Sequence, residues 1–188
     1  MAAFSYLNNG YKILKNISAG FDTEPSMLQD RLQTLKDTVK TVQEEFTDLQ
    51  KRSIKQEILS KSESSVIKNG VKFISFDYSK SSFSRGIDVK TMGAIGDEII
   101  NSEGNKDIFV LSAGIINSKP VILLQSAGNL TEKGINCSSI AKDTGTVLKG
   151  GGGGKTEFAQ VGGSDPDLLA RAFEFAGKKV LELLSRVQ

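Results

Sequence analysis

The stretch IFVLSAGIINSKPVILLQ, residues 108–125, contains two apolar runs separated by a polar turn. The runs 108–115 and 121–125 are rich in β-branched and aliphatic residues, which favours strands. Residues 117–120 lie between them and supply the residue types that β-turns use. The stretch therefore predicts a hairpin of two central strands, around which the rest of the fold is arranged.

Two patterned segments precede this hairpin. Residues 71–76 alternate apolar and polar positions, which predicts a strand with Val71, Phe73 and Phe76 facing inward. Residues 87–101 carry apolar side chains at helical spacing and are followed by residue types that end helices. The segments predict a strand and a helix packed against the hairpin.

Two further helices are predicted after the hairpin. Residues 131–144 predict a weaker helix, because Gly134 interrupts its pattern. Asp165 and Pro166 are typical of a helix start, and an apolar face continues to Val187. The order of elements predicts an α/β (α+β) fold, in which a small mixed sheet is flanked by helices.

A heptad pattern precedes the predicted sheet. Its apolar residues recur at alternating spacings of four and three: Leu28, Leu32, Leu35, Val39, Val42, Phe46 and Leu49. Pro25, with Ser26 as the cap, predicts a helix over about residues 27–60. This seam could pack on residues 4–17 in an intrachain helical hairpin, or on another chain in a coiled coil. The sequence thus predicts a helical stem over 1–62 and a globular domain over 63–188.

Composition narrows the classes of function. The 24 basic and 22 acidic residues give a net charge of +2 without a linear basic patch. The chain has no histidine and only one cysteine, which excludes Ser-His and Cys-His nucleophile pairs, disulfides within the chain and multi-cysteine metal sites. No apolar run approaches the ~20 residues of a membrane span. We expect a cytoplasmic protein with no cofactor and no membrane partner.

The segment LKGGGGGKTEFAQVGG, residues 148–163, has the most unusual chemistry of the chain. A flexible linker is the plainest interpretation. A P-loop is rejected, because Lys149 stands where that motif needs its first glycine and no helix can follow directly. Consecutive glycine N–H groups could instead line an anion-binding concavity, with Lys149 and Lys155 at its rim and Gln160 beside it. The glycines could equally allow tight packing of a neighbouring helix of the chain.

The glycine run, followed by Phe158-Ala159-Gln160-Val161-Gly162-Gly163, resembles the signature that closes the alanyl-tRNA synthetase family. Residues 88–100 and 107–112 resemble the helix and following strand of its C-terminal, DHH-associated domain. The heptad segment corresponds to the stem that joins this domain to the editing domain. A related domain completes the DHH phosphoesterases, but their version normally includes a histidine, which this sequence lacks.

The resemblance implies a module that is not catalytic alone. In the family, this domain binds the outer corner of tRNA(Ala), supports aminoacylation and editing, and often forms a homodimer. The remaining synthetase domains would lie N-terminal to this fragment. Two alternatives are a structural dimerisation module without RNA binding, and the substrate-binding half of a DHH-type phosphoesterase.

Candidate RNA contacts follow from the glycine segment, because Lys side chains and backbone N–H groups suit phosphate and 2′-OH contacts. They are Lys149, Gly150, Gly151, Gly152, Gly153, Gly154, Lys155, Gln160, Gly162 and Gly163, with Lys142 second.

Four other residues have both a functional and a structural interpretation. Tyr78, Phe83 and Arg85 could stack on an unpaired base, although such aromatic residues more often belong to a core. Cys137 is expected to be a small, part-buried residue, whose thiol pKa a helix N-terminus could lower.

Overall fold

The computed structural model describes residues 2–60, 65–81, 87–104 and 106–186. The chain divides into two compact units, Met1–Leu49 and Gln50–Gln188. The predicted boundary between residues 62 and 63 lies outside the described residues and stays a prediction.

The first unit is helical. It contains α1 (Ala2–Gly20), a 3₁₀ turn (Pro25–Met27) and the beginning of α2 (Leu28–Ser60), which confirms the helix predicted over 27–60. The expected cap at Ser26 is wrong. Glu24 occupies the N-cap of the 3₁₀ turn without a side-chain hydrogen bond, and Pro25 opens that turn because its fixed φ suits a first helical position.

The apolar faces of this unit are exposed. Along the seam, Val39 is 55% exposed and Phe46 59%, whereas Leu28 is buried. The large apolar side chains of α1 are exposed as well: Phe4, Tyr6, Leu7, Tyr11, Ile13, Leu14 and Ile17. The intrachain hairpin, one of the two predicted arrangements, is therefore not formed, because neither helix covers the apolar face of the other.

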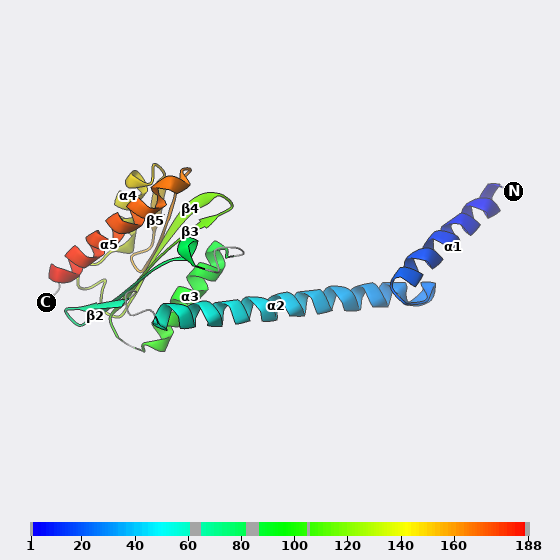
Figure 1. Ribbon diagram of the computed structural model, residues 1–188, viewed down its shortest axis with the longest axis horizontal. Helices are drawn as coiled ribbons and strands as arrows, with labels where there is room; N and C mark the ends of the chain where they lie inside the picture. Colours follow the sequence, from blue (N-terminus) through cyan, green and yellow to red (C-terminus); the bar gives the residue numbers. More distant parts are fainter. Residues whose placement is uncertain (1, 61–64, 82–86, 105, 187–188) are drawn as a thin grey trace. The chain divides into compact units, whose positions relative to one another are not determined.

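The second unit contains a six-stranded sheet with the order β1-β2-β3-β4-β6-β5 (Figure 1). The strands are β1 (Ser65–Lys68), β2 (Val71–Asp77), β3 (Ile108–Ile116), β4 (Lys119–Ala127), β5 (Gly151–Gly154) and β6 (Phe158–Gly162). Among the described strands, the β2–β3 pair alone is parallel, and the other pairs are antiparallel. The sheet is thus mixed, as the sequence predicts.

The predicted hairpin forms the centre of this sheet. β3 and β4 pair over their full length, from Ile108 opposite Ala127 to Ile116 opposite Lys119. Asn117 and Ser118 form the turn at positive φ, a conformation that asparagine tolerates better than most residues. A short 3₁₀ turn (Tyr78–Lys80) follows β2, and α3 (Val89–Ser102), capped by Asp88, precedes β3.

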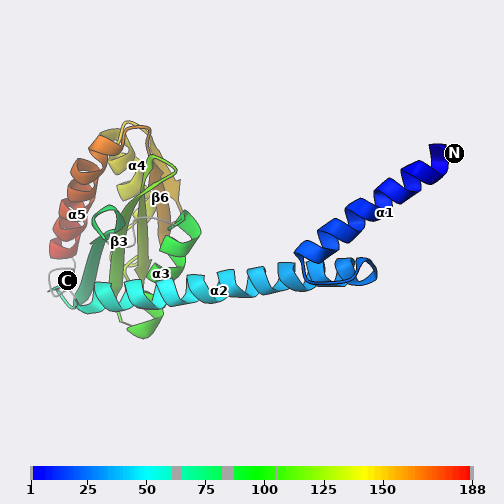
Figure 2. The same ribbon diagram turned by 45° about the vertical axis from the view of Figure 1, so that its right-hand side comes forward.

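Helices cover both faces of the sheet (Figure 2). α4 (Cys137–Val147) and α5 (Leu169–Arg186) pack on one face, and α3 packs on the other. Val71, Phe73 and Phe76 are buried as predicted, but on opposite faces of the sheet, because Phe73 belongs to the first core and Phe76 to the second. The two strands at the centre are consequently buried on both sides, which explains their continuous apolar runs.

Three further elements differ from the sequence-based expectation. β1 was not predicted, and its side chains are mostly exposed. The weak helix expected over 131–144 is instead α4, which starts at Cys137 after the Asn136 cap. The glycine run, expected to be a loop, forms β5.

Candidate nucleic-acid interface

The glycine run forms an edge strand of the sheet. β5 pairs with β6 in antiparallel register, from Gly151 opposite Gly162 to Gly154 opposite Ala159. The linker interpretation is therefore wrong. The concavity of consecutive N–H groups is not formed either, because successive N–H groups of an extended strand point in opposite directions.

α4 leads into this strand through a defined helix end. The N–H of Gly150 donates to the carbonyl of Gly145 at 2.9 Å, and the N–H of Lys149 donates to the carbonyl of Thr146 at 3.3 Å. These two bonds form a Schellman motif, in which the residue after the cap adopts a left-handed conformation. That residue is Lys149, with φ +50°, at a position where glycine is the usual choice. The side chain of Lys149 is exposed beside the start of β5.

The turn between β5 and β6 is tied to the rest of the unit. The N–H of Lys155 donates to the carbonyl of Phe158 at 2.7 Å across the turn. The carbonyl of Glu157 accepts from Ser126 at 2.8 Å, and that of Thr156 accepts from Cys137, also at 2.8 Å. The hairpin of β5 and β6, which is meant by the hairpin from here on, is therefore held at its tip by the end of β4 and the start of α4.

Several glycines are required by close packing. A Cβ at Gly152 would come within 3.0 Å of the Ala141 carbonyl on α4, and one at Gly150 would come as close to the Gly162 carbonyl. Cβ atoms at Gly154 and Gly163 would likewise meet backbone within 3.0 Å. The interpretation that glycine allows a neighbouring helix to pack closely is confirmed at Gly152.

The remaining glycines of the hairpin do not make such contacts. A Cβ at Gly151, Gly153 or Gly162 would meet nothing within 4 Å. The hairpin thus has one face packed on α4 and one face open.

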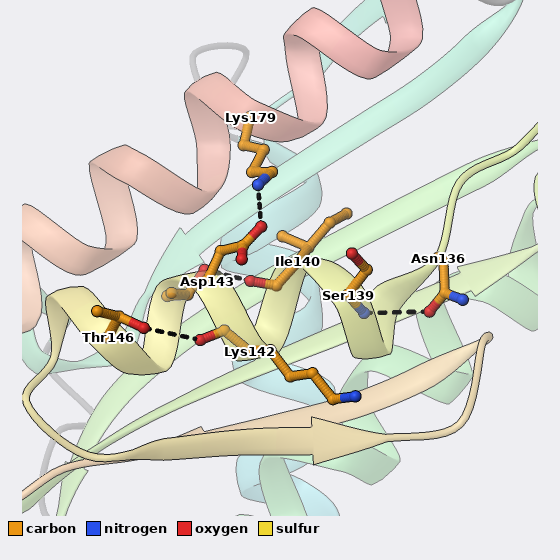
Figure 3. Close-up of polar contacts among 8 residues, drawn as sticks. Asn136, Ser139, Ile140, Lys142, Asp143, Thr146 and Lys179 are labelled. Atoms are coloured by element: carbon orange, nitrogen blue, oxygen red, sulfur yellow. Dashed lines mark hydrogen bonds and ion pairs between the residues drawn. The ribbon is translucent and has the colours of Figure 1, made fainter.

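The three predicted contact lysines all lie around this hairpin. Lys149 precedes β5, Lys155 follows it, and both side chains are exposed. Lys142 is exposed on α4, and Figure 3 shows it leaving the helix on the side opposite the ion pair of Asp143 with Lys179. Gln160 is exposed on β6. The predicted lysines and Gln160 are therefore accessible to a polynucleotide.

The start of α4 is ordered by local hydrogen bonds. The Asn136 side chain accepts from the N–H of Ser139 at 3.1 Å, as a helix cap does (Figure 3). Within the helix, the hydroxyl of Thr146 donates to the carbonyl of Lys142. These contacts fix the helix that carries Lys142 and supports β5.

The other candidates belong to the core or lie outside the described residues. Tyr78 is only 2% exposed, and burial raises the pKa of its phenol well above the usual range, so it is not available for stacking. Phe83 and Arg85 lie outside the described residues. Cys137, expected to be part-buried, is fully buried, and burial raises the pKa of its thiol to about 11, so a helix N-terminus does not lower it.

One exposed residue of the hairpin was missed by sequence reasoning. Phe158, at the start of β6, is 41% exposed although it is a large aromatic residue. The signal for it was the alternation from Phe158 to Gly162, which has the period of a strand with one buried face.

The described residues lack two further features. No group of three or more His, Cys, Asp or Glu side chains there could hold a metal ion. No helix formed by those residues is both long and apolar enough to span a bilayer.

Comparison with known proteins identifies similar chains. Residues 71–182 match the family described as the DHHA1 domain. The alanine–tRNA ligase of Acetivibrio thermocellus is 27% identical over 179 residues, which are 95% of this chain and 19% of the ligase. The ligase of Thermotoga maritima is 28% identical over 178 residues, 93% of this chain and 19% of that protein. The chain therefore spans about a fifth of the length of the ligases it matches.

Comparison with solved structures adds two similar chains, the first of which shares the fold of this one. A DHH-domain protein described as a member of a family of ribosomal proteins superimposes with a TM-score of 0.53, at 17% identity, over 83% of this chain and 35% of that one. The C-Ala domain of the Aquifex aeolicus alanyl-tRNA synthetase gives a TM-score of 0.47 at 23% identity, over 64% of this chain and 97% of that one.

Proposed function

The chain belongs to the DHHA1 domain family, and from this we propose that it is the tRNA-binding and dimerisation domain of an alanine–tRNA ligase. In this role it holds the outer corner of tRNA(Ala) while other domains of the ligase, N-terminal to this segment, aminoacylate and edit. It is not catalytic alone, it needs no cofactor, and its setting is the cytoplasm.

One observation carries the RNA-binding part of the proposal. A glycine hairpin stands at the edge of the sheet with an exposed lysine at each end, in a chain similar to alanine–tRNA ligases over 95% of its length. The outer edge of β5 has no strand beside it among the described residues. Cationic side chains next to accessible backbone suit the phosphate and 2′-OH groups of a folded RNA, which is recognised by shape.

The dimerisation part rests on the helical unit. Its seam beyond Leu28 and the apolar face of α1 are both exposed, so the unit needs a partner to cover them. α1 has 19 residues, about 28 Å of helix, and the seam from Leu28 to Leu49 spans about 32 Å. A second copy of this chain offers faces of matching length and character.

The test of RNA binding compares two double variants with the same change of charge. Replacing Lys149 and Lys155 with glutamate should weaken binding of full-length tRNA at least tenfold and lower the slope of log affinity against log salt by about two. Replacing Lys106 and Lys119, two exposed lysines outside the hairpin of β5 and β6, should change affinity far less. Equal losses in both variants would show that the hairpin is not the contact surface.

The test of dimerisation is light scattering on the whole chain. Val39→Asp with Phe46→Asp should convert a dimer to a monomer, because each charge would be buried in the apolar seam. A wild-type dimer that does not shift tRNA at low salt would favour the purely structural alternative.

A further inference from the structure

Three glycines of the hairpin are explained neither by packing nor by backbone conformation. A Cβ at Gly151, Gly153 or Gly162 would meet open space, and none of the three has a positive φ. Glycine inside a strand costs about 0.5–1 kcal/mol relative to alanine. By contrast, Gly152 and Gly154, which alternate with them, are required by nearby backbone atoms.

The open glycines share a face with two larger side chains. Residues opposite each other in a sheet lie on the same face of it. Gly162 is therefore on the same face as Gly151, and Gln160 is on the same face as Gly153. Phe158 is two residues before Gln160 and points to that side as well. It is paired with Gln125, whose side chain donates to the Gly93 carbonyl and to Asp97 on α3.

This open face continues the side of the sheet that carries α3. There α3 packs over β3 and β4, and the hairpin extends beyond them at the edge of the sheet. Phe158 is 41% exposed there, and the neighbouring Gln160 offers both a donor and an acceptor. The two Cα positions on β6 are about 7 Å apart.

We propose that Phe158 and Gln160 hold an unstacked base of the bound RNA, the ring of Phe158 stacking on its face and the amide of Gln160 bonding its edge. The proposal rests on the proposed tRNA binding and assigns it a face of the hairpin. The exposed Lys149 and Lys155 at the two ends of β5 provide the charge complementarity for the flanking phosphates. The open glycines leave room for the sugar and backbone, which side chains would displace. RNA bases are reached in this way where loops leave them unpaired.

The first experiment uses fluorescence, because the chain has no tryptophan. In Phe158→Trp, the indole should stack on the base, so its emission should be quenched on adding tRNA while affinity stays close to wild type. Phe175→Trp, at a side chain 37% exposed on α5, is the matched control and should keep its emission. Unchanged emission of the Phe158→Trp variant at saturating tRNA would overturn the proposal.

The second experiment measures affinity. Phe158→Ala should weaken tRNA binding about tenfold or more, the effect of losing one stacked base, and Phe175→Ala should not. Gly153→Val should weaken binding too, while its unfolding midpoint is unchanged or higher, because valine favours strands and meets open space here.

The failures of the two proposals are distinguishable. If the Lys149 and Lys155 double variant loses affinity but Phe158→Ala and Gly153→Val do not, tRNA binding stands and the stacking site is wrong. If neither the lysines nor this face affects affinity, the assignment of the hairpin falls as well.

Discussion

The two compact units show equally regular apolar patterns and use them differently. In the unit Gln50–Gln188, central residues such as Phe109 and Leu124 are fully buried, between helices on both faces of the sheet. In the unit Met1–Leu49, Val39 and Phe46 occupy regular heptad positions and are more than half exposed. Periodicity therefore predicts which side of an element is apolar, and it does not identify what covers that side.

The difference has an energetic consequence. Burial of an aliphatic or aromatic side chain contributes about 1.5–3 kcal/mol, so the sheet unit gains its stability within one chain. Isolated helices gain little in water, and most helical stability comes from packing of an apolar face. The helical unit is therefore expected to depend on association, and its stability on protein concentration.

The largest effect is expected from removing a core ring. Phe109→Ala should lower the free energy of unfolding of the sheet unit by about 3–5 kcal/mol, because the residue is fully buried. Phe46→Ala, the same change in the helical unit, should leave that unfolding free energy nearly unchanged and weaken self-association instead. Urea unfolding and light scattering measure the two effects. Equal losses of sheet stability would contradict the division into units.

Glycine substitutions sharpen the same comparison. Gly152→Ala should destabilise the sheet unit by roughly 2–3 kcal/mol, because its methyl group would collide with the Ala141 carbonyl. In Gly10→Ala on α1, the new methyl group would meet open space. This change should favour the helical state by about 1 kcal/mol and so raise the helicity of the unit. Circular dichroism and thermal unfolding report both. A stable Gly152→Ala variant would show that α4 does not pack closely on β5.

A buried thiol gives the sheet unit a pH dependence of its own. Burial raises the pKa of Cys137 to about 11 from an ordinary value of 9.0. The unfolded chain therefore loses this proton first, so the contribution of the thiol is complete below about pH 9 and is lost as pH rises from 9 to 11. The expected loss is about 2 kcal/mol.

The measurement compares the wild type with Cys137→Ala. Urea unfolding at pH 8 and pH 11 should show a smaller loss of stability in the variant, since other groups, such as Tyr78, which titrates there in the unfolded chain, contribute equally in both proteins. Parallel losses in the two proteins would mean that Cys137 is not buried as described.

Local pattern was sufficient to predict several elements. α2 and α3 carry a helical period in their own residues, and the central hairpin carries two apolar runs around a turn, so the sequence places all of them within a few positions of their observed ends. The glycine strand carries no such pattern, because glycine is a poor strand former. β5 is extended because β6 pairs with it and α4 packs on it, and these are contacts distant from the pattern itself.

The same reason limits prediction of the site. The exposure of Lys149 and Lys155 follows from their charge, whereas the two faces of the hairpin appear only once the register is known. Phe158 was missed because it stood in a segment expected to be a loop. The burial of Phe76 was predicted, but not that it lies on the face opposite Phe73, because a sheet covered on both faces does not alternate between apolar and polar.

The smallest expected effect lies where the sheet unit holds one residue in an unfavourable conformation. Lys149 has φ +50° at the end of α4, where a side chain costs roughly 1 kcal/mol more than glycine. Lys149→Gly should therefore raise the unfolding free energy by up to about 1 kcal/mol and preserve the Schellman bonds, while tRNA binding weakens through the loss of one cation.

Lys142→Gly, mid-helix on α4, removes an equal charge and should instead destabilise by about 1 kcal/mol. If Lys149→Gly lowered stability as Lys142→Gly does, the left-handed helix end would be wrong. If it gained stability without losing affinity, Lys149 would not contact RNA.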